Sequence, residues 1–549
     1  MIRGFGRRPR QVWTPRRILT WLVTAWVAVT VCGCAPSARP SIDAAGYPAC
    51  VPGSGGDLGT SESAGLEVTI DLDAARQTML GFGASDCWSI QHVGRWPIET
   101  RQAIADLLFE TGLDGGGDPR GIGLSIWRFN IGAGSSRTEH IGLPWRRADT
   151  FLDDTLADYD WNRLPGQRWF LQAASARGVR RFIAFVNSPP VTMTRNGRAF
   201  CDPESGTTNL ADGREADFAA FLADIVEHFR EDEGVEFDTI SPFNEPQWDW
   251  ERGTQEGCRY SVADMKRVVD ALASEPGLGP TRIEIPESGS LLDLWRGERY
   301  LEAFFDPQGA AYVGGTVAPR IAAHCYKTDL PETGLVESRR ALREVLDWYQ
   351  GLRYSMTEFC VLGEHGVGRD LGIDTALHVA RVIHFDLALA GASSWQWWLA
   401  VSPYDYKDGL IYIEKDPDGG EYLESKLLWA MGNFSRFVRP GMIRLELERS
   451  DGATEEETVE SVMVSSYLDP HRGVVATVFV NWMEESAPVR LAVEGGDVGG
   501  WIPYVTSVDA SLEAFEFVPT DRTVRLPARS VVTLVGRLSS NGDSSGKGA

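Results

Sequence analysis

The feature that most constrains this chain is a long alternation of short apolar segments with amphipathic, helix-like segments between residues 79 and 437. Strands that alternate with helices favour an α/β fold with a parallel sheet, and eight of them favour a (β/α)8 barrel. The expected strands cover residues 81–87, 124–131, 182–186, 237–243, 283–286, 321–326, 354–357 and 393–397. The expected helices include residues 98–113, 216–230, 338–352 and 377–390.

The pattern changes after Pro440-Gly441, where short strands follow one another without helices. This spacing predicts an all-β sandwich over residues 438–537. In residues 65–78, Val68, Ile70 and Leu72 alternate with polar residues and indicate a further strand. The barrel would leave this strand unpaired, so we expect it to join the sandwich. Residues 538–549 are rich in Ser and Gly, and we expect them to be disordered.

The N-terminus resembles an export signal. Six arginines lie in the first 17 residues, and residues 18–33 carry no charge. The run Val31-Cys32-Gly33-Cys34 resembles a lipobox, so residues 1–34 are predicted to be a lipoprotein signal with Cys34 as the lipidated residue. An ordinary signal peptide or an uncleaved anchor is the alternative. Residues 35–64 are expected to form a flexible tether. The prediction is a bacterial cell-surface lipoprotein that meets the membrane through its lipid alone, or else a secreted protein.

Composition narrows the function. The formal net charge is -24, and an acidic chain repels phosphate, so nucleic acid is not an expected partner. The 19 Trp suit either a core or the flat faces of sugar rings. No CxxC, HExxH or GxxxxGK[ST] pattern occurs, so neither a metal nor a cofactor is predicted. Cys201 and Cys258 follow the third and fourth expected strands, and the sequence leaves open whether a disulfide joins them.

Two glutamates stand where expected barrel strands end. Glu245 follows the fourth strand in the run Asn244-Glu245-Pro246, and Glu358 follows the seventh. Active sites of such barrels lie at the carboxyl ends of the strands, and the fourth and seventh strands face each other across the barrel mouth. Cleavage of a glycosidic bond needs one carboxylic acid for the leaving oxygen and one carboxylate that attacks carbon or activates water. Either glutamate alone is better explained by a surface ion pair, but the two together predict a glycosidase.

At this point the chain resembles a known family. Asn244-Glu245-Pro246 and Thr357-Glu358 resemble the catalytic motifs of clan A glycoside hydrolases, and other segments resemble family 30 of that clan. The resemblance implies a barrel with an attached β-sandwich. It also implies retaining double displacement, with Glu358 as the nucleophile and Glu245 as the acid/base. The other matching segments are residues 81–84, 125–134, 187–190, 395–398 and 432–441.

Within that family, residues 144–147, 192–197 and 406–412 look most like the endo-β-1,6-galactanase subgroup. One departure is Thr192, which stands where many members have a Trp. The predicted function is an exported retaining endo-glycosidase that hydrolyses a β-linked polysaccharide, with endo-β-1,6-galactanase as the first choice. The alternatives are a xylanase, a β-1,6-glucanase, an exo-glycosidase, or a surface lipoprotein that binds glycans without cleaving them.

Three polar residues are expected beside the two glutamates. Arg128 ends the second strand inside an apolar run, where a guanidinium needs a carboxylate partner. The resemblance implies that this partner is Glu358, and a structural ion pair elsewhere is the alternative. Asn244 can donate to a sugar 2-hydroxyl. Tyr326 is either a hydrogen-bond partner of the nucleophile or a core aromatic.

Aromatic and amide residues at other strand ends complete the predicted substrate site. Trp395 and Trp397 share strand parity and therefore point the same way, which predicts a sugar-binding floor on the eighth strand, although Trp395 is as well explained by packing. Trp88 and Asn187 end the first and third strands and are expected near sugar hydroxyls.

Overall fold

The computed structural model describes residues 55–59, 65–153, 155, 158–202 and 208–539. The predicted signal segment with Cys34, the tether apart from residues 55–59, and residues 540–549 of the predicted tail lie outside the described residues. Among the helices that the structure does describe, none is long and apolar enough to cross a bilayer.

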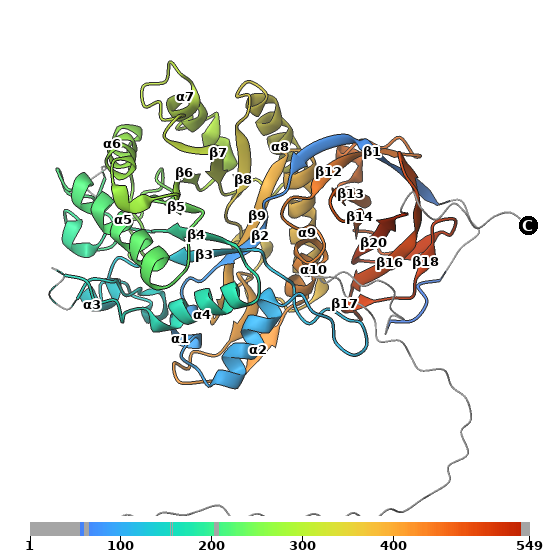
Figure 1. The fold of residues 1–549 in the computed structure, drawn as a ribbon, viewed down its shortest axis with the longest axis horizontal. Helices are drawn as coiled ribbons and strands as arrows, with labels where there is room; N and C mark the ends of the chain where they lie inside the picture. The colour runs from blue at the N-terminus through green and yellow to red at the C-terminus, as the bar shows by residue number, and fades with distance from the viewer. Residues whose placement is uncertain (1–54, 60–64, 154, 156–157, 203–207, 540–549) are drawn as a thin grey trace, which may run out of the picture. The chain divides into compact units, whose positions relative to one another are not determined.

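Eight parallel strands of the described chain close into a barrel. Each strand pairs with its successor, and the last strand pairs with both its predecessor and the first strand. The predicted (β/α)8 barrel is therefore confirmed (Figure 1). Strands β10 (Gly409–Ile413) and β11 (Tyr422–Glu424) extend the sheet beyond the last barrel strand. The barrel strands are β2 (Gly81–Ser85), β3 (Ile126–Asn130), β4 (Arg181–Phe185), β5 (Thr239–Ser241), β6 (Arg282–Ser288), β7 (Val317–Ala323), β8 (Arg353–Met356) and β9 (Ala392–Ser402).

The helices cover the outside of the barrel. Helix α6 begins with a capping box, in which the Ser261 hydroxyl accepts from the Asp264 amide and the Asp264 carboxylate accepts from the Ser261 amide. Helix α8 begins six residues before the predicted segment, and it buries Leu335, Leu342 and Leu346 on one face. The helices are α1 (Ile90–Val93), α2 (Ile98–Phe109), α3 (Ser135–Thr138), α4 (Pro165–Ala176), α5 (Glu215–Asp232), α6 (Val262–Ala273), α7 (Tyr300–Phe305), α8 (Glu332–Leu346), α9 (Ile373–Ala388) and α10 (Lys426–Ser435).

A second sheet holds ten strands, most of them antiparallel, in the order β17-β16-β20-β14-β13-β12-β1-β15-β19, with β18 beside β16. Its two ends share one hydrophobic cluster, which includes Val489 of β15 and Trp501 of β16, so the predicted α/β barrel with an all-β part is confirmed. The strands are β1 (Leu66–Thr78), β12 (Ile443–Arg449), β13 (Val462–Asp469), β14 (Val474–Asn481), β15 (Ala487–Glu494), β16 (Val498–Thr506), β17 (Ser511–Ala514), β18 (Val518–Pro519), β19 (Val524–Leu526) and β20 (Ser530–Leu538).

Strand β1 lies between β12, with which it is antiparallel, and β15, with which it is parallel. The first described strand of the chain therefore belongs to the sheet formed by the last ones, as expected. Strand β16 was not predicted, because Gly499, Gly500 and Pro503 interrupt its apolar pattern.

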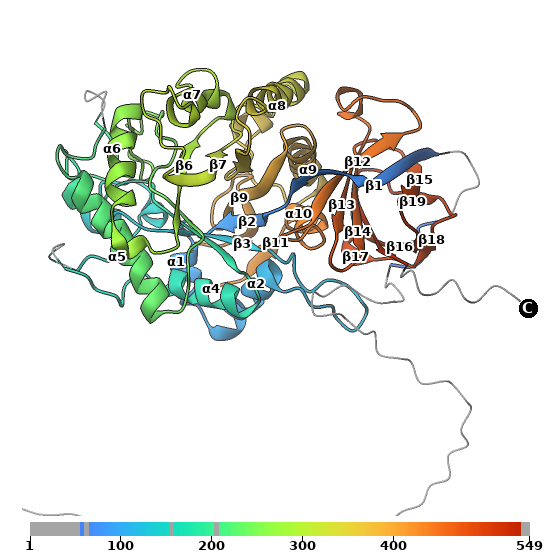
Figure 2. The same cartoon turned by 45° about the horizontal axis from the view of Figure 1, so that its top comes forward.

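Helices α9 and α10 lie between the barrel and the second sheet (Figures 1 and 2). The Asn433 side chain of α10 donates to the Tyr504 carbonyl at 2.9 Å, and the Thr533 hydroxyl donates to the Asn433 carbonyl at 2.6 Å. Phe437 packs against Tyr504 with ring centroids 4.4 Å apart. The barrel, helices α9 and α10 and the side of the second sheet that faces them thus share one hydrophobic core. The contact between the two parts lies outside the barrel and leaves the mouth of the barrel open.

Candidate active site

A cavity of about 800 Å³ opens at the carboxyl ends of the barrel strands. Its size suits a few sugar units, because ligand pockets commonly measure about 300–1,000 Å³. Both predicted catalytic glutamates line it, and so do side chains from the loops that follow β2, β3, β5, β6, β7, β8 and β9. They include Trp88, Arg146, Asn244, Trp248, Asp293, Tyr326, Lys327, Trp398, Tyr406 and Asp408.

The two glutamates lie close together. One carboxyl oxygen of Glu245 lies within 4.8 Å of one carboxyl oxygen of Glu358. The Glu358 side chain is nearly inaccessible at 5% exposure, whereas that of Glu245 is 15% exposed. This close approach fits retaining glycosidases, whose two carboxyl groups lie about 5–5.5 Å apart, because inverting enzymes need a wider gap for water.

The backbone around Glu245 is strained. Glu245, Glu287 and Lys327 all adopt left-handed φ angles, of 44°, 58° and 61° respectively. Each such residue costs about 1–3 kcal/mol and persists where the surrounding structure holds it. The Glu245 amide donates to the Glu287 carbonyl at 2.7 Å. Gly289 leaves the necessary space, because a Cβ there would come within 2.9 Å of the Glu245 carboxyl.

Arg128 and Tyr326 both contact Glu358. Arg128 is fully buried, and its Nη1 lies 2.9 Å from Glu358 Oε2. The Tyr326 hydroxyl donates to Glu358 Oε1 at 3.0 Å. Burial raises the pKa of Glu358 above its ordinary value, and the charges of His324 and Arg128 oppose that rise. The structure therefore brings three of the predicted site residues into one contact set.

Two further residues, which were not predicted from the sequence, complete this set. His324 follows β7 and contacts three carboxylates: its Nδ1 lies 3.1 Å from Glu245 Oε1 and 3.5 Å from Glu358 Oε1, and its Nε2 lies 3.2 Å from Glu287 Oε2. Burial opposes a charged ring, but Glu358, Glu245 and Glu287 raise the pKa of His324 to about 10. The signal in the sequence was its place two residues before Tyr326, just past the strand.

Glu287 lies at the end of β6 and is completely buried. Thr357 and Ser241 donate to its two oxygens at 2.6 and 2.7 Å, and Arg128 Nη2 lies 3.5 Å away. Burial favours the neutral form, but Arg128, His324 and Thr357 outweigh it and lower the pKa of Glu287 to about 2. Arg128 and His324 thus supply two positive charges against three carboxyl groups. Glu245 is the most exposed of the three carboxyl groups.

These charges bear on metal binding. Glu245, His324 and Glu358 offer ligand atoms at spacings that a metal ion could bridge. A metal ligand must be a neutral imidazole, and His324 is protonated well above neutral pH. Arg128 adds a second positive charge beside Glu358. The arrangement suits acid/base and nucleophilic chemistry rather than a cation.

The remaining predicted residues divide into two groups. Asn244 and Trp88 line the cavity, and the Asn244 side-chain oxygen has no hydrogen-bond partner among the described residues. Asn187 is buried outside the cavity lining, and its amide nitrogen lies 3.8 Å from Cys87 Sγ. The Asn187 oxygen also has no partner among the described residues, so the two residues differ in that Asn244 lines the cavity and Asn187 does not.

The structure corrects the prediction for Trp395 and Trp397. Both are fully buried and neither lines the cavity. They do share one side of β9, with ring centroids 6.3 Å apart, but the Trp395 indole donates to Asp386 of α9 at 2.9 Å. Their side of the strand is therefore the helix-facing one. The neighbouring Trp398 has the opposite parity and lines the cavity, edge-on to Trp88 at 5.3 Å.

The sequence did not decide whether a disulfide joins Cys201 and Cys258. In the structure both are buried free thiols. They lie beside each other, since the Arg259 amide donates to Cys201 Sγ at 3.4 Å. The backbones around them are hydrogen-bonded as well, through the Cys201 amide and the Trp250 carbonyl at 3.1 Å. The loops after β4 and β5 are thus held together without a covalent bond.

A barrel mouth with two facing carboxyl groups defines a site of the glycoside hydrolase type. A model described as O-Glycosyl hydrolase family 30 matches residues 65–412. The chain therefore belongs to O-glycosyl hydrolase family 30, a retaining family of clan A.

Several relatives show how far the likeness reaches. An endo-beta-1,6-galactanase of Hypocrea rufa is 29% identical over 235 residues, which are 39% of this chain and 48% of that protein. This chain thus matches about half the length of that relative. The glucuronoxylanase XynC of Bacillus subtilis is 23% identical over 87% of this chain and 93% of that protein.

Solved structures extend the comparison to most of the chain. A conserved exported protein from Bacteroides fragilis is 33% identical, with a TM-score of 0.80 over 85% of this chain and 99% of that one. The catalytic domain of a xylanase C from Talaromyces cellulolyticus has a TM-score of 0.64 at 20% identity, over 86% of this chain and 100% of that one. The latter likeness is one of fold.

Proposed function

We propose that this protein is a retaining endo-glycosidase in which Glu358 is the nucleophile and Glu245 the acid/base. The approach of their carboxyl oxygens to within 4.8 Å is the observation that carries the proposal. Glu358 attacks the anomeric carbon as the bond to the leaving oxygen breaks, and Glu245 gives that oxygen its proton. Glu245 then takes a proton from water, whose oxygen displaces Glu358 from the same carbon. Two inversions give net retention.

The surrounding residues fit these roles. Arg128 and Tyr326 stabilise the Glu358 anion through an ion pair and a hydrogen bond. His324 holds Glu245 in place at 3.1 Å and turns its other nitrogen to Glu287. Asn244 lines the cavity beside Glu245 and offers its amide to a sugar 2-hydroxyl.

For the substrate we propose a β-1,6-linked galactan. The similar Hypocrea protein is an endo-beta-1,6-galactanase. Two of the three segments that resemble this subgroup also supply cavity walls: Arg146 comes from residues 144–147, and Tyr406 and Asp408 come from residues 406–412. A xylanase is the second candidate, favoured by the likeness to XynC over most of the chain.

A substrate panel tests this function. The purified protein is incubated with β-1,6-galactan, glucuronoxylan and β-1,6-glucan, and the products are followed by proton NMR. We expect galactan to be cleaved to mixed oligosaccharides, and the first anomer seen to be β. Inactivity on all three polymers, or an α-anomer as the first product, would contradict the proposal. Cleavage of xylan alone would keep the mechanism and overturn the substrate.

We further infer that the protein is exported and anchored by lipid at Cys34. The arginine-rich start, the uncharged run after it and the likeness to the exported Bacteroides fragilis protein support this inference. Cys34→Ala is expected to move the protein from the detergent phase to the aqueous phase and to leave hydrolysis unchanged. A wild-type protein without lipid by mass spectrometry would contradict the anchor.

A further inference from the structure

One wall of the cavity is a short exposed segment, residues 362–368, which we call the 362–368 loop. It follows Glu358 and the last barrel strand but one, and its Leu362, Gly363 and Val367 line the cavity. Val367 is 97% exposed and Leu362 is 38% exposed. An exposed loop with apolar tips needs an anchor if it is to keep a fixed position beside a ligand.

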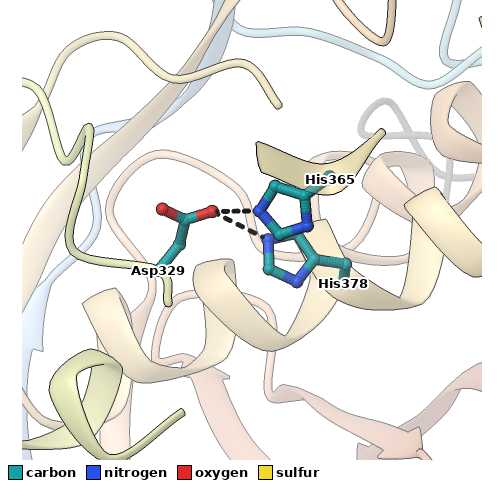
Figure 3. Close-up of side chains that lie close together, drawn as sticks. All are labelled: Asp329, His365 and His378. Carbon is teal, nitrogen blue, oxygen red and sulfur yellow. Dashed lines mark hydrogen bonds and ion pairs between the residues drawn. The ribbon is translucent and has the colours of Figure 1, made fainter. Parts of the chain in front are cut away.

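A side-chain cluster provides that anchor. His365, within the 3-10 helix η5 (Gly363–His365), donates from Nε2 to Asp329 Oδ2 at 2.8 Å. His378 of α9 donates from Nε2 to the same oxygen at 3.1 Å. Figure 3 shows both rings turned to this one oxygen. Asp329 follows β7, so the cluster joins the loop to two elements of the barrel.

A fourth residue, Arg381, shows which ring nitrogen of His378 carries the hydrogen. Arg381 Nη2 lies 3.4 Å from His378 Nδ1, and a guanidinium can only donate. Nδ1 of His378 is therefore the acceptor, and its Nε2 carries the hydrogen that Asp329 receives. Hydrogen bonds from His365 and His378 outweigh burial and hold the pKa of Asp329 well below its ordinary value.

Asp329, His365 and His378 offer ligand atoms within 4.8 Å of one another, as a metal site would. The position of Arg381 argues against a metal ion there. A metal-bound histidine donates its second nitrogen to an acceptor. Here that nitrogen of His378 faces a cation. The cluster is therefore a hydrogen-bonded anchor built on a buried carboxylate.

A second contact holds the far end of the loop. Lys407 Nζ donates to the Gly366 and Gly368 carbonyls, each at 3.1 Å. His365 lies between these contacts and the strand, with its side chain 15% exposed. Loss of His365 would leave the loop held from one side.

We propose that Asp329 and His365 are positioning residues that hold the 362–368 loop against the bound polysaccharide. The proposal rests on the proposed glycosidase function of the cavity. The two residues lie behind the loop and act through it. The predicted ligand of the loop is the part of a glycan chain beyond the sugar that reacts with Glu358.

The test compares three variants. His365→Leu removes the donor, His365→Gln keeps an N–H at a similar reach, and His471→Leu makes the same change on the exposed surface of the second sheet. We expect His365→Leu to raise KM for the polysaccharide about tenfold, the usual loss for a hydrogen bond to a charged group. Its kcat, and its hydrolysis of an aryl glycoside, should change less than about twofold. His365→Gln should restore most of the affinity, and His471→Leu should match the wild type.

Amide hydrogen exchange separates this proposal from the function on which it rests. Peptides that cover residues 361–370 should exchange faster in His365→Leu than in the other proteins, whether or not any substrate is cleaved. Unchanged exchange and unchanged KM in His365→Leu would overturn the proposal. Faster exchange of the wild-type loop after treatment with a chelator, reversed by Zn²⁺, would also overturn it, because a metal ion would then hold the loop.

Discussion

The floor and the rim of the cavity are built on opposite principles. The floor consists of Glu358, which lines the cavity, and of Arg128, Glu287 and His324 beneath it, all buried and joined by ion pairs and hydrogen bonds. The rim consists of exposed apolar side chains on loops, with Trp248 50%, Leu362 38%, Val367 97% and Tyr406 51% exposed. Removing one partner of a buried ion pair costs about 3–5 kcal/mol, whereas exposed loop residues change at little cost.

The floor should therefore determine the rate of the reaction, and the rim should determine which polysaccharide binds. A change in the floor leaves a buried charge without its partner, so it should lower the rate on every substrate. A change in the rim alters contacts with sugar faces, so it should depend on the substrate.

Glu358→Ala should have the largest effect. Because Glu358 is the proposed nucleophile, its loss should lower kcat on any substrate by on the order of 10⁴-fold or more. Azide fills the space of the missing carboxylate, so its addition should restore cleavage of an aryl glycoside and give the α-glycosyl azide. Folding is checked by circular dichroism. Near-normal hydrolysis in this variant would remove Glu358 from its role.

Glu245→Gln should come second. General acid catalysis contributes about 10²–10⁴-fold, and a polysaccharide leaving group depends on it fully. An activated aryl group leaves without a proton, so its glycosylation step should survive. Single-turnover rates on both substrates measure the contrast. Equal losses on the two substrates would mean that Glu245 is not the proton donor.

Tyr326→Phe should change the pH profile more than the rate at the optimum. The Tyr326 hydroxyl stabilises the ionised form of Glu358, so its loss raises the pKa of Glu358 further. Glu358 must be ionised to attack, so the acidic limb of kcat/KM should move to higher pH. Tyr312→Phe, at an exposed position, is the matched control. An acidic limb that stays in place or moves to lower pH would contradict the assignment.

The sequence predicted both glutamates and Arg128, but it missed two of the buried residues that contact them. Arg128 lies within β3, and Glu245 and Glu358 stand at strand ends, where the barrel fixes both position and direction. His324 and Glu287 stand there too, but a lone buried His or Glu gives no pattern until its partners are known. Strand parity correctly paired Trp395 with Trp397. Parity alone does not say which side of the strand faces the helices. We predicted that both rings face the sugar, and the structure shows that they face the helices.

The anchor of the 362–368 loop was beyond sequence reasoning for a different reason. Asp329 lies in the segment after β7, His365 in η5 and His378 in α9, and the three have no regular spacing. The helix predicted at 338–352 lies six residues earlier in the structure, at Glu332–Leu346. Several charged residues interrupt the apolar pattern of α8 in the sequence. The geometry of loops and of side-chain clusters depends on contacts between segments that are distant in the sequence. The periodicity of hydrophobic residues does not predict such contacts.

The smallest expected effect belongs to the rim of the cavity. Trp248 lies three residues after Glu245 and is half exposed at the cavity, with Lys327 Nζ 4.2 Å from its ring centroid. Glu245 is the proposed proton donor to the leaving oxygen, so we expect this ring to contact the leaving part of the glycan. An aromatic contact contributes about 1 kcal/mol, so Trp248→Ala should raise KM for the polysaccharide about fivefold. Its kcat and its hydrolysis of an aryl glycoside should stay within about twofold of wild type.

Trp348→Ala provides the control for this variant. Trp348 is 86% exposed and follows the end of α8, whose chain runs back to the amino-terminal end of the barrel. It therefore lies away from the mouth, and its loss should leave both kinetic constants unchanged. If Trp248→Ala instead lowered kcat on every substrate as Glu358→Ala does, the rim would belong to the chemistry, and the division between floor and rim would fail. If both Trp variants raised KM alike, the polysaccharide would be held by scattered exposed aromatics rather than by the cavity.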